Sequence, residues 1–394
     1  MEDRLREIII SITNRCNLRC AMCDIPLVEN KDELSTAEAK ALISDASRLN
    51  PHSIVFSGGE PLLRKDIFEL ISYADQYKIN TCLTSNGTLI NEDIARQLNS
   101  AHIGVVNISI DGTEEVHDQL RGRGSFKKAI IALENLRRCK IETTIATVVC
   151  GKNYKTLASV VELAKKYNVT TVKFQPFNEL FLVDKERKKD FFVLPIVAQE
   201  IKKSLGEVIE LSQKYKIATN PVEYLNFIPG YLSGAWQGYS NNGCTALLSS
   251  CPVAADGNVY LCWPLSDIVL GNVKRNRLSE IWNSDRHNQL RQEVLKKGCV
   301  GCLMSCYDYN AGKYDWRDLI RLKAKKMTRP KFYKRQYYGF YQYLKYISGK
   351  IINRSLNPMR MQVHKKDDVI EQALKEIKAA KDVLMREAAR LEKK

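Results

Sequence analysis

A chain of 394 residues is long enough to bury a large core, as one large domain or as two to three smaller ones. It has no signal-peptide pattern and no run of about 18 to 20 apolar residues, so we expect a cytoplasmic protein that does not span a membrane. The net charge of +16 is concentrated after residue 316, where 22 Lys and Arg stand against 8 Asp and Glu, and the rest of the chain carries no footprint of specific nucleic-acid binding.

Six short β-rich runs alternate with helical patterns between residues 7 and 180. The segments between the runs carry apolar residues at helical spacing, and the runs themselves cover residues 7–13, 53–58, 81–85, 104–110, 142–150 and 171–177. Such alternation is typical of a parallel sheet with right-handed crossovers. We therefore predict an α/β fold in which residues 1–215 form a partial (β/α)6 barrel similar to a TIM barrel.

In a barrel of this kind the chemistry takes place at the carboxyl ends of the strands. These positions hold, in chain order, Cys16, the segment Gly58-Gly59-Glu60-Pro61, the pair Ser85-Asn86, and then Ser109 and Asp111. Because Ser109 and Asp111 are two residues apart on an extended chain, we expect both side chains to face the lumen.

Nine of the twelve cysteines fall into two groups, which in a reducing compartment indicates metal binding or catalysis rather than disulfide bonds. The first group is CNLRCAMC, in which Cys16, Cys20 and Cys23 share one predicted loop. Three thiolates can hold three corners of a [4Fe-4S] cluster and leave the fourth iron open to another ligand. The spacing alone also fits a zinc site or a redox pair.

Taken together, these motifs resemble the radical S-adenosylmethionine (SAM) superfamily, over residues 5 to 310. Cys16, Cys20 and Cys23 match its CxxxCxxC signature, and Gly58-Gly59-Glu60-Pro61 matches its GGEP motif. The stretch SIDGTEEVHDQLRG is similar to the SxDG…HDxxRG pattern of the subgroup that modifies peptides and sulfatases.

The resemblance implies a cofactor site. The open iron would chelate the amino and carboxylate groups of SAM, and the GGEP backbone with Glu60 would contact the methionyl amine. Ser109, Asp111 and Arg121 would also contact SAM, and we count Ser85 and Asn86 with the same site.

The second cysteine group lies between residues 216 and 315, which we predict to be a separate domain. It resembles the SPASM domain or its shortened "twitch" form, which binds auxiliary iron–sulfur clusters, and it consists of Cys244, Cys251, Cys262, Cys299, Cys302 and Cys306. Since the CX5C element of a full SPASM domain is missing, we expect one auxiliary [4Fe-4S] cluster. The twitch-like ligand set is Cys244, Cys262, Cys299 and Cys302, with Cys251 and Cys306 as possible replacements, and four thiolates would also suit zinc.

One departure from the family concerns acid–base chemistry. Sulfatase-maturing members place an acidic base directly after the cysteine that corresponds to Cys262, whereas Trp263 and Pro264 follow it here. Asp267, the nearest carboxylate downstream, is therefore the candidate for a catalytic residue, and formylglycine formation is not expected.

The last segment, residues 316–394, is predicted to be a basic helical tail rich in aromatic residues. It interleaves Tyr and Phe with Lys and Arg and ends in a helical pattern with a seam of apolar residues. Such a segment fits either a helix packed on the body or weak contact with a membrane surface.

The resemblance implies an enzyme that cleaves SAM reductively at a [4Fe-4S] cluster. The 5'-deoxyadenosyl radical would then take hydrogen from a peptide side chain or a small sugar-like substrate, leading to oxidation or a cross-link, with an electron donor such as flavodoxin or ferredoxin. The alternative is a non-catalytic iron–sulfur or zinc protein whose basic tail binds a membrane or nucleic acid. The GGEP motif and the residues of the fourth strand weigh against it, since a passive protein needs neither.

Overall fold

The computed structural model describes residues 5–28, 32–236, 246–297 and 302–304. The chain divides into two compact units, Met1–Gly312 and Lys313–Lys394. All described residues belong to the first unit. The predicted basic tail and three of the predicted cluster cysteines, Cys244, Cys299 and Cys306, lie outside the described residues.

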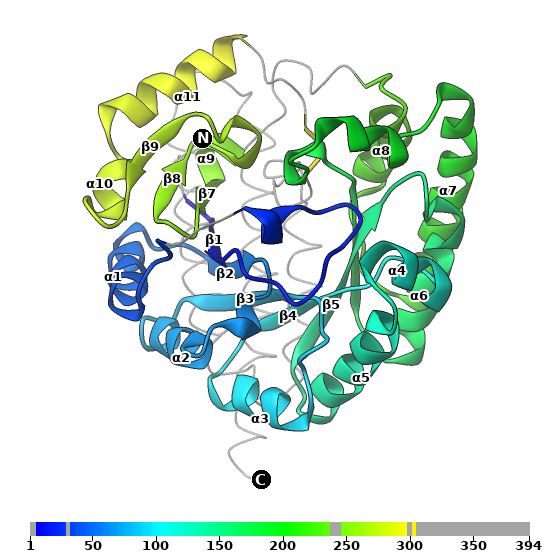
Figure 1. The fold of residues 1–394 in the computed structure, drawn as a ribbon, viewed down its shortest axis with the longest axis horizontal. Coiled ribbons are helices and arrows are strands. Elements are labelled where there is room, and N and C mark those ends of the chain that lie inside the picture. Colours follow the sequence, from blue (N-terminus) through cyan, green and yellow to red (C-terminus); the bar gives the residue numbers. More distant parts are fainter. Residues whose placement is uncertain (1–4, 29–31, 237–245, 298–301, 305–394) are drawn as a thin grey trace, which may run out of the picture. The chain divides into compact units, whose positions relative to one another are not determined.

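The strands of the described residues form one nine-stranded sheet in the order β6-β5-β4-β3-β2-β1-β7-β8-β9 (Figure 1). Their bounds are β1 (Glu7–Thr13), β2 (Ser53–Gly58), β3 (Asn80–Ser85), β4 (Val105–Ser109), β5 (Glu142–Val149), β6 (Thr171–Pro176), β7 (Ser250–Val253), β8 (Asn258–Tyr260) and β9 (Val269–Asn272). Strands β1 to β6 are all parallel to their neighbours, which confirms the six predicted strands and the partial barrel.

Helices cover the outer face of the barrel strands (Figure 1). The helices are α1 (Thr36–Ala46), α2 (Ile67–Gln76), α3 (Glu92–Ser100), α4 (Glu114–Arg121), α5 (Ser125–Arg138), α6 (Leu157–Lys166), α7 (Ala198–Tyr215), α8 (Val222–Leu232), α9 (Ala246–Ser249), α10 (Leu278–Trp282) and α11 (Asp285–Lys297). Five of them correspond to the predicted crossovers, whereas α4 was not predicted. None of the helices within the described part of the chain has both the length and the apolar character that a membrane crossing needs.

Alternation along the strands decides which side chains form the core. Ile8, Ile10 and Ile12 of β1 are almost fully buried among the apolar faces of the helices. The residues between them point to the opposite, concave face, because successive side chains of a strand alternate. The first crossover helix begins at a capping box, in which the Ser35 side chain accepts from the Glu38 amide and the Glu38 side chain binds Ser35 in return.

Strand β7 joins the barrel sheet beside β1, which the sequence pattern did not predict. It runs parallel to β1, with Glu7 opposite Ser250 and Ile10 opposite Val253, and it continues into the antiparallel strands β8 and β9. β1 therefore has β2 on one side and β7 on the other, and β6 does not close onto it. Strands from before residue 215 and strands from after residue 216 belong to the same sheet. The sheet therefore does not mark the predicted domain boundary between these two residues, and that boundary stays a prediction.

Candidate functional site

The predicted cysteine loop follows β1 directly. Cys16, Cys20 and Cys23 lie on the stretch between β1 and the short 3-10 helix Ile25–Leu27. The Leu18 amide and the Asn86 side-chain amide donate to the Cys16 sulfur at 3.4 and 3.9 Å. In the described residues, no three His, Cys, Asp or Glu side chains converge as they would around a single metal ion. A cluster is several atoms across and its ligands are spaced more widely, so three thiols on one loop remain a suitable donor set for it.

The three thiols are partly buried, and two of them, Cys20 and Cys23, lie beside the Arg121 guanidinium. Burial raises the pKa of all three, that of Cys23 to about 11. The Arg121 guanidinium acts in the opposite direction and lowers the pKa of Cys20 and Cys23. Iron binding requires the thiolate form. The positive charge of Arg121 thus favours the thiolate form of Cys20 and Cys23.

Gly58 and Gly59 lie in direct contact with the chain that leads into the cysteine loop. The Gly59 amide donates to the Thr13 carbonyl at 2.7 Å, and the Glu60 amide donates to the Arg15 carbonyl at 2.8 Å. A Cβ atom on Gly58 or Gly59 would come within 2.2 Å of the Thr13 or Arg15 carbonyl oxygen, respectively. Only glycine fits at this contact, so the two glycines bring the GGEP segment against the cysteine loop.

The Glu60 carboxylate is fully buried and already hydrogen-bonded. It accepts from the Asn86 amide at 2.8 Å, from the Ser85 hydroxyl at 3.0 Å and from the Leu62 amide at 3.2 Å. Glu60, Ser85 and Asn86, predicted from two different strand ends, are therefore brought together. In this arrangement Glu60 joins the ends of β2 and β3, and its contact with the methionyl amine stays a prediction.

A pH dependence of stability follows from Glu60. Burial raises its pKa from an ordinary value of 4.5 to about 7, so the fold favours the neutral acid. This contribution is fully present below pH 4.5 and is lost as the pH rises through about 7, with a total of about 3 kcal/mol. In the metal-free protein, Glu60→Gln should remove this loss, as measured by urea unfolding from pH 5 to 8. Glu69→Gln, at an exposed carboxylate, is the control and should follow the wild type; equal pH profiles for all three proteins would contradict the expectation.

Asp111 and Arg121 form a buried ion pair at the end of β4. Two nitrogens of the Arg121 guanidinium, Nε and Nη2, donate to the Asp111 carboxylate. The same carboxylate accepts a hydrogen bond from the Val148 amide at 2.9 Å. The Asp111 amide donates to His117 Nδ1 at 3.2 Å, and burial lowers the pKa of His117 to about 4, so this ring is a neutral acceptor at pH 7. The Asp111 carboxylate is fully buried by these contacts rather than open to the lumen. It holds Arg121 beside the cysteines, and a direct contact of either residue with SAM stays a prediction.

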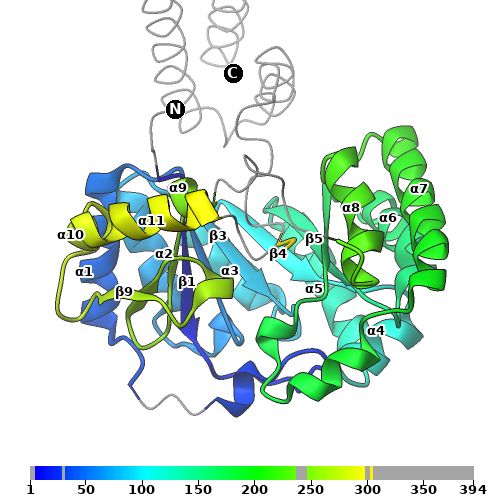
Figure 2. The same cartoon turned by 90° about the horizontal axis from the view of Figure 1, so that it is seen from above.

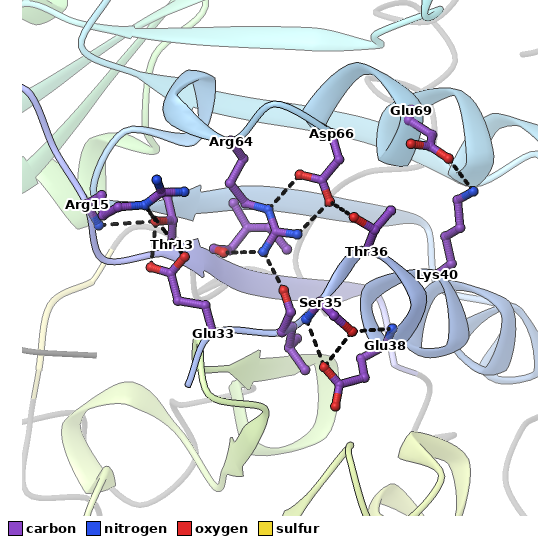
Figure 3. Close-up of polar contacts among 12 residues, drawn as sticks. Thr13, Arg15, Glu33, Ser35, Thr36, Glu38, Lys40, Arg64, Asp66 and Glu69 are labelled. Atoms are coloured by element: carbon purple, nitrogen blue, oxygen red, sulfur yellow. Dashed lines mark hydrogen bonds and ion pairs between the residues drawn. The ribbon is translucent and has the colours of Figure 1, made fainter. Parts of the chain in front are cut away.

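Residues that the sequence analysis did not single out hold the first part of the cysteine loop (Figure 3). The Glu33 carboxylate accepts from the Thr13 hydroxyl at 2.7 Å and from the Asn14 amide at 3.0 Å. The buried Arg64 guanidinium donates to the Ile12 and Leu34 carbonyls at 3.2 and 2.7 Å and pairs with Asp66. Arg64 lies only four residues after Glu60, but nothing in its spacing indicates which carbonyls it binds.

The concave face of the barrel carries a row of neutral polar side chains. Ser11 pairs with Ser57, Thr84 with Asn107, Asn107 with Thr144, and Thr144 with Thr171. Phe56 pairs with Leu83, which places Ser57 beside Thr84. Registered neighbours in a parallel sheet point to the same face, so one hydroxyl or amide from each strand lies at the same height. We call these six residues the polar belt.

The described residues of the second cysteine group differ in their surroundings. Cys251 lies within β7 opposite Ile8, and burial raises its pKa to about 12. Cys262 begins the 3-10 helix Trp263–Leu265, and Cys302 precedes Leu303, whose carbonyl accepts from the Tyr224 hydroxyl at 2.7 Å. Asp267 is exposed in the turn before β9. The placement of Cys251 favours a packed core thiol, while the ligand roles of all three cysteines and the catalytic role of Asp267 stay predictions.

Comparison with known proteins agrees with this geometry. Residues 10–164 match the model of the radical SAM superfamily, and residues 244–306 match the SPASM model, an iron–sulfur cluster-binding domain. The AdoMet-dependent heme synthase of Methanosarcina barkeri is 28% identical over 78% of this chain and 93% of its own. The mycofactocin maturase MftC of Mycobacterium ulcerans is 30% identical over 74% of this chain and 78% of its own.

A solved structure shares the fold. Streptococcus suis SuiB bound to S-adenosylmethionine superposes with a TM-score of 0.61 at 16% sequence identity, covering 76% of this chain and 73% of that chain. The two family matches also identify the cofactors as a [4Fe-4S] cluster, SAM and an auxiliary iron–sulfur cluster, and the chain as an enzyme, which sets aside the non-catalytic alternative. The chain belongs to the radical SAM superfamily and carries a SPASM domain after its barrel.

Proposed function

We propose that this radical SAM enzyme removes a hydrogen atom from a side chain of a peptide, in an oxidation or cross-linking reaction. The observation that carries the proposal is the polar belt. A peptide segment brings amide donors and acceptors into a barrel, and each group that leaves water needs a partner. Hydroxyls and amides, which both donate and accept, supply such partners without charge.

The charges of the concave face also favour a neutral substrate. Among the described strands β1 to β6, its charged residues are Glu7, Glu142 and Lys173, two carboxylates and one cation. A substrate with several carboxylates, such as a tetrapyrrole, calls for clustered cations in the strands that hold it. The polar belt contains no cation. The concave face therefore suits a peptide better than a tetrapyrrole with several carboxylates, the class of molecule that the name of the heme synthase relative indicates.

Relatives add support for a peptide. MftC is named a maturase, and SuiB has been crystallised with its precursor peptide SuiA. The hydroxyls of a sugar would suit the belt as well, so a small sugar-like substrate is the other outcome to be tested. An electron donor such as flavodoxin or ferredoxin completes the proposed reaction.

The residues around the site have separate roles in the proposed reaction. Cys16, Cys20 and Cys23 hold the [4Fe-4S] cluster, and Gly58 and Gly59 let the GGEP backbone approach it. The bound cluster and SAM supply the 5'-deoxyadenosyl radical. Arg121 favours the thiolates, and the belt holds the substrate below the loop. One auxiliary cluster, with ligands from Cys244, Cys262, Cys299 and Cys302, completes the cofactor set.

Deuterium transfer tests the substrate class. The reconstituted enzyme is incubated anaerobically with SAM, a reductant and perdeuterated peptides. These peptides are the ones encoded by genes next to the gene of the enzyme. Deuterium in 5'-deoxyadenosine, measured by mass spectrometry, is the expected result. Parallel reactions contain a deuterated iron porphyrin with carboxylate side chains or deuterated sugars. Transfer from either of these and not from the peptides would overturn the peptide assignment.

A further inference from the structure

The far end of the cysteine loop is held by one ion pair that joins distant parts of the chain. Arg187 Nη1 lies 2.6 and 2.7 Å from the two carboxylate oxygens of Asp24, the residue directly after Cys23. Arg187 Nη2 donates to the Ala21 carbonyl at 2.6 Å, between Cys20 and Cys23. One guanidinium thus binds both the backbone and the carboxylate of the same turn of the loop.

Backbone hydrogen bonds reinforce this junction. The Asp24 amide donates to the Phe181 carbonyl at 2.7 Å, and the Val183 amide donates to the Asp24 carboxylate at 3.0 Å. The Asp24 side chain is only 6% exposed, whereas that of Arg187 is 35% exposed. The carboxylate is therefore fixed by the protein, and the guanidinium approaches it from the solvent side.

Arg187 belongs to a segment that follows β6, residues 177–193, which we call the strap. Two hydrogen bonds of 2.7 Å join the strap to the barrel: the Phe177 amide donates to the Val149 carbonyl, and the Gly151 amide donates to the Phe191 carbonyl. At its end, the Val193 amide donates a hydrogen bond to the Leu232 carbonyl of α8 at 2.9 Å. The strap therefore has firm supports on the β6 side, independent of Asp24.

The strap crosses the side of the barrel that the sheet leaves open. β6 is an edge of the sheet and does not pair with β1. The chain leaving β6 nevertheless reaches the loop that leaves β1, and Figure 2 shows the deep-blue loop running beside the green segment. Among the described residues, the ion pair is the salt bridge that connects the chain after β6 with the loop after β1.

We propose that Arg187 and Asp24 form a latch that positions Cys20 and Cys23 for cluster binding by fixing the cysteine loop to the strap. The inference rests on the proposed function, since it takes these cysteines as cluster ligands. Glu33 fixes the beginning of the loop through Thr13 and Asn14, and the latch fixes its end. Both residues of the latch act through the loop and are positioning residues.

The latch predicts a change at the cluster when Arg187 is replaced. In Arg187→Ala, the Ala21 carbonyl and the Asp24 carboxylate both lose their guanidinium, and the loop between Cys20 and Cys23 keeps only its backbone hydrogen bonds to the strap and to α4. We expect the rate of 5'-deoxyadenosine formation per reconstituted cluster, without substrate, to fall about tenfold or more, as for other groups that orient metal ligands. The electron paramagnetic resonance spectrum of the reduced protein with SAM should change as well, and Arg187→Lys, which keeps the charge, should restore part of both properties.

Lys188→Ala is the matched control, because Lys188 lies on the same strap and pairs with the exposed Glu179 instead. It should behave as the wild type. If Arg187→Ala matches Lys188→Ala in spectrum and rate, the latch is overturned, even where thermal unfolding shows a loss of stability. Should Arg187→Ala not fold, Asp24→Asn, which keeps the shape of the side chain, decides by the same criteria. A wild-type spectrum that does not respond to SAM would instead overturn the proposed function, and the latch with it.

Discussion

Replacing Cys16, Cys20 and Cys23 with alanine should reduce SAM cleavage to background. The three thiols share one loop after β1, and the GGEP segment is hydrogen-bonded to the chain that leads into it. In the proposed assignment these three thiols are the protein ligands of the cluster that reduces SAM, so we expect the triple variant to lose that cluster. After anaerobic reconstitution, we expect about seven to eight irons per wild-type chain, for two clusters, and about four fewer in the triple variant. Iron analysis and the yield of 5'-deoxyadenosine measure both effects.

The control for this experiment is Cys139→Ala. Cys139 is partly exposed at the end of α5, away from both cysteine groups in the sequence, and its loss should leave iron content and SAM cleavage unchanged. A triple variant that retained the full iron content would show that the cluster is bound elsewhere. Equal iron loss in Cys139→Ala would show that the assay reports general damage to the fold.

Asp111→Asn should destabilise the protein by about 3 to 5 kcal/mol, the cost expected for one partner lost from a buried ion pair. The substitution leaves the Arg121 guanidinium buried without its counter-charge, next to Cys20 and Cys23. Burial by itself lowers the pKa of Arg121, and the charge and hydrogen bonds of Asp111, together with the neighbouring Cys20 and Cys23, raise it above its ordinary value. Urea unfolding of the metal-free protein at pH 7 measures the change in the free energy of unfolding.

Asp93→Asn is the matched control. Asp93 also pairs with an arginine, Arg96, but both side chains are exposed on α3. Exposed pairs of this kind contribute little, so the control should unfold at nearly the wild-type urea concentration. If Asp111→Asn and Asp93→Asn had the same free energy of unfolding, the Asp111–Arg121 pair would have to be exposed to water in solution. This result would contradict the role of Asp111 in holding Arg121 beside the cysteines.

Local patterns in the sequence were sufficient to predict the barrel. All six strands appear within one or two residues of their predicted bounds, because each is a short run rich in apolar and β-branched residues between helical patterns or loops. Helix α4 was missed because it is short and mostly polar, with His117 and Leu120 as its buried residues. Its residues match the SxDG…HDxxRG pattern, and they have too few apolar positions to predict a helix.

Contacts between distant residues could not be predicted in the same way. The topology rule placed Glu60, Ser85 and Asn86 at neighbouring strand ends, and the structure brings them together. The same rule does not indicate which donors and acceptors form hydrogen bonds with one another. It therefore could not predict that the Glu60 carboxylate accepts from Asn86, Ser85 and Leu62. Asp24 and Arg187 are separated by 163 positions, and neither stands out from the other charged residues of the chain.

The pairing of β7 with β1 has a consequence for how the protein is made. Among the described strands, β1 is synthesised before its neighbours, and β2, on one side of it, follows soon after. Its other neighbour is synthesised only after the whole barrel has emerged, so the backbone groups on that edge of β1 stay unpaired throughout the synthesis of the core. An unpaired strand edge is a template for association with other chains. We therefore expect the pairing of β7 with β1 to remove this template once the SPASM segment has been synthesised.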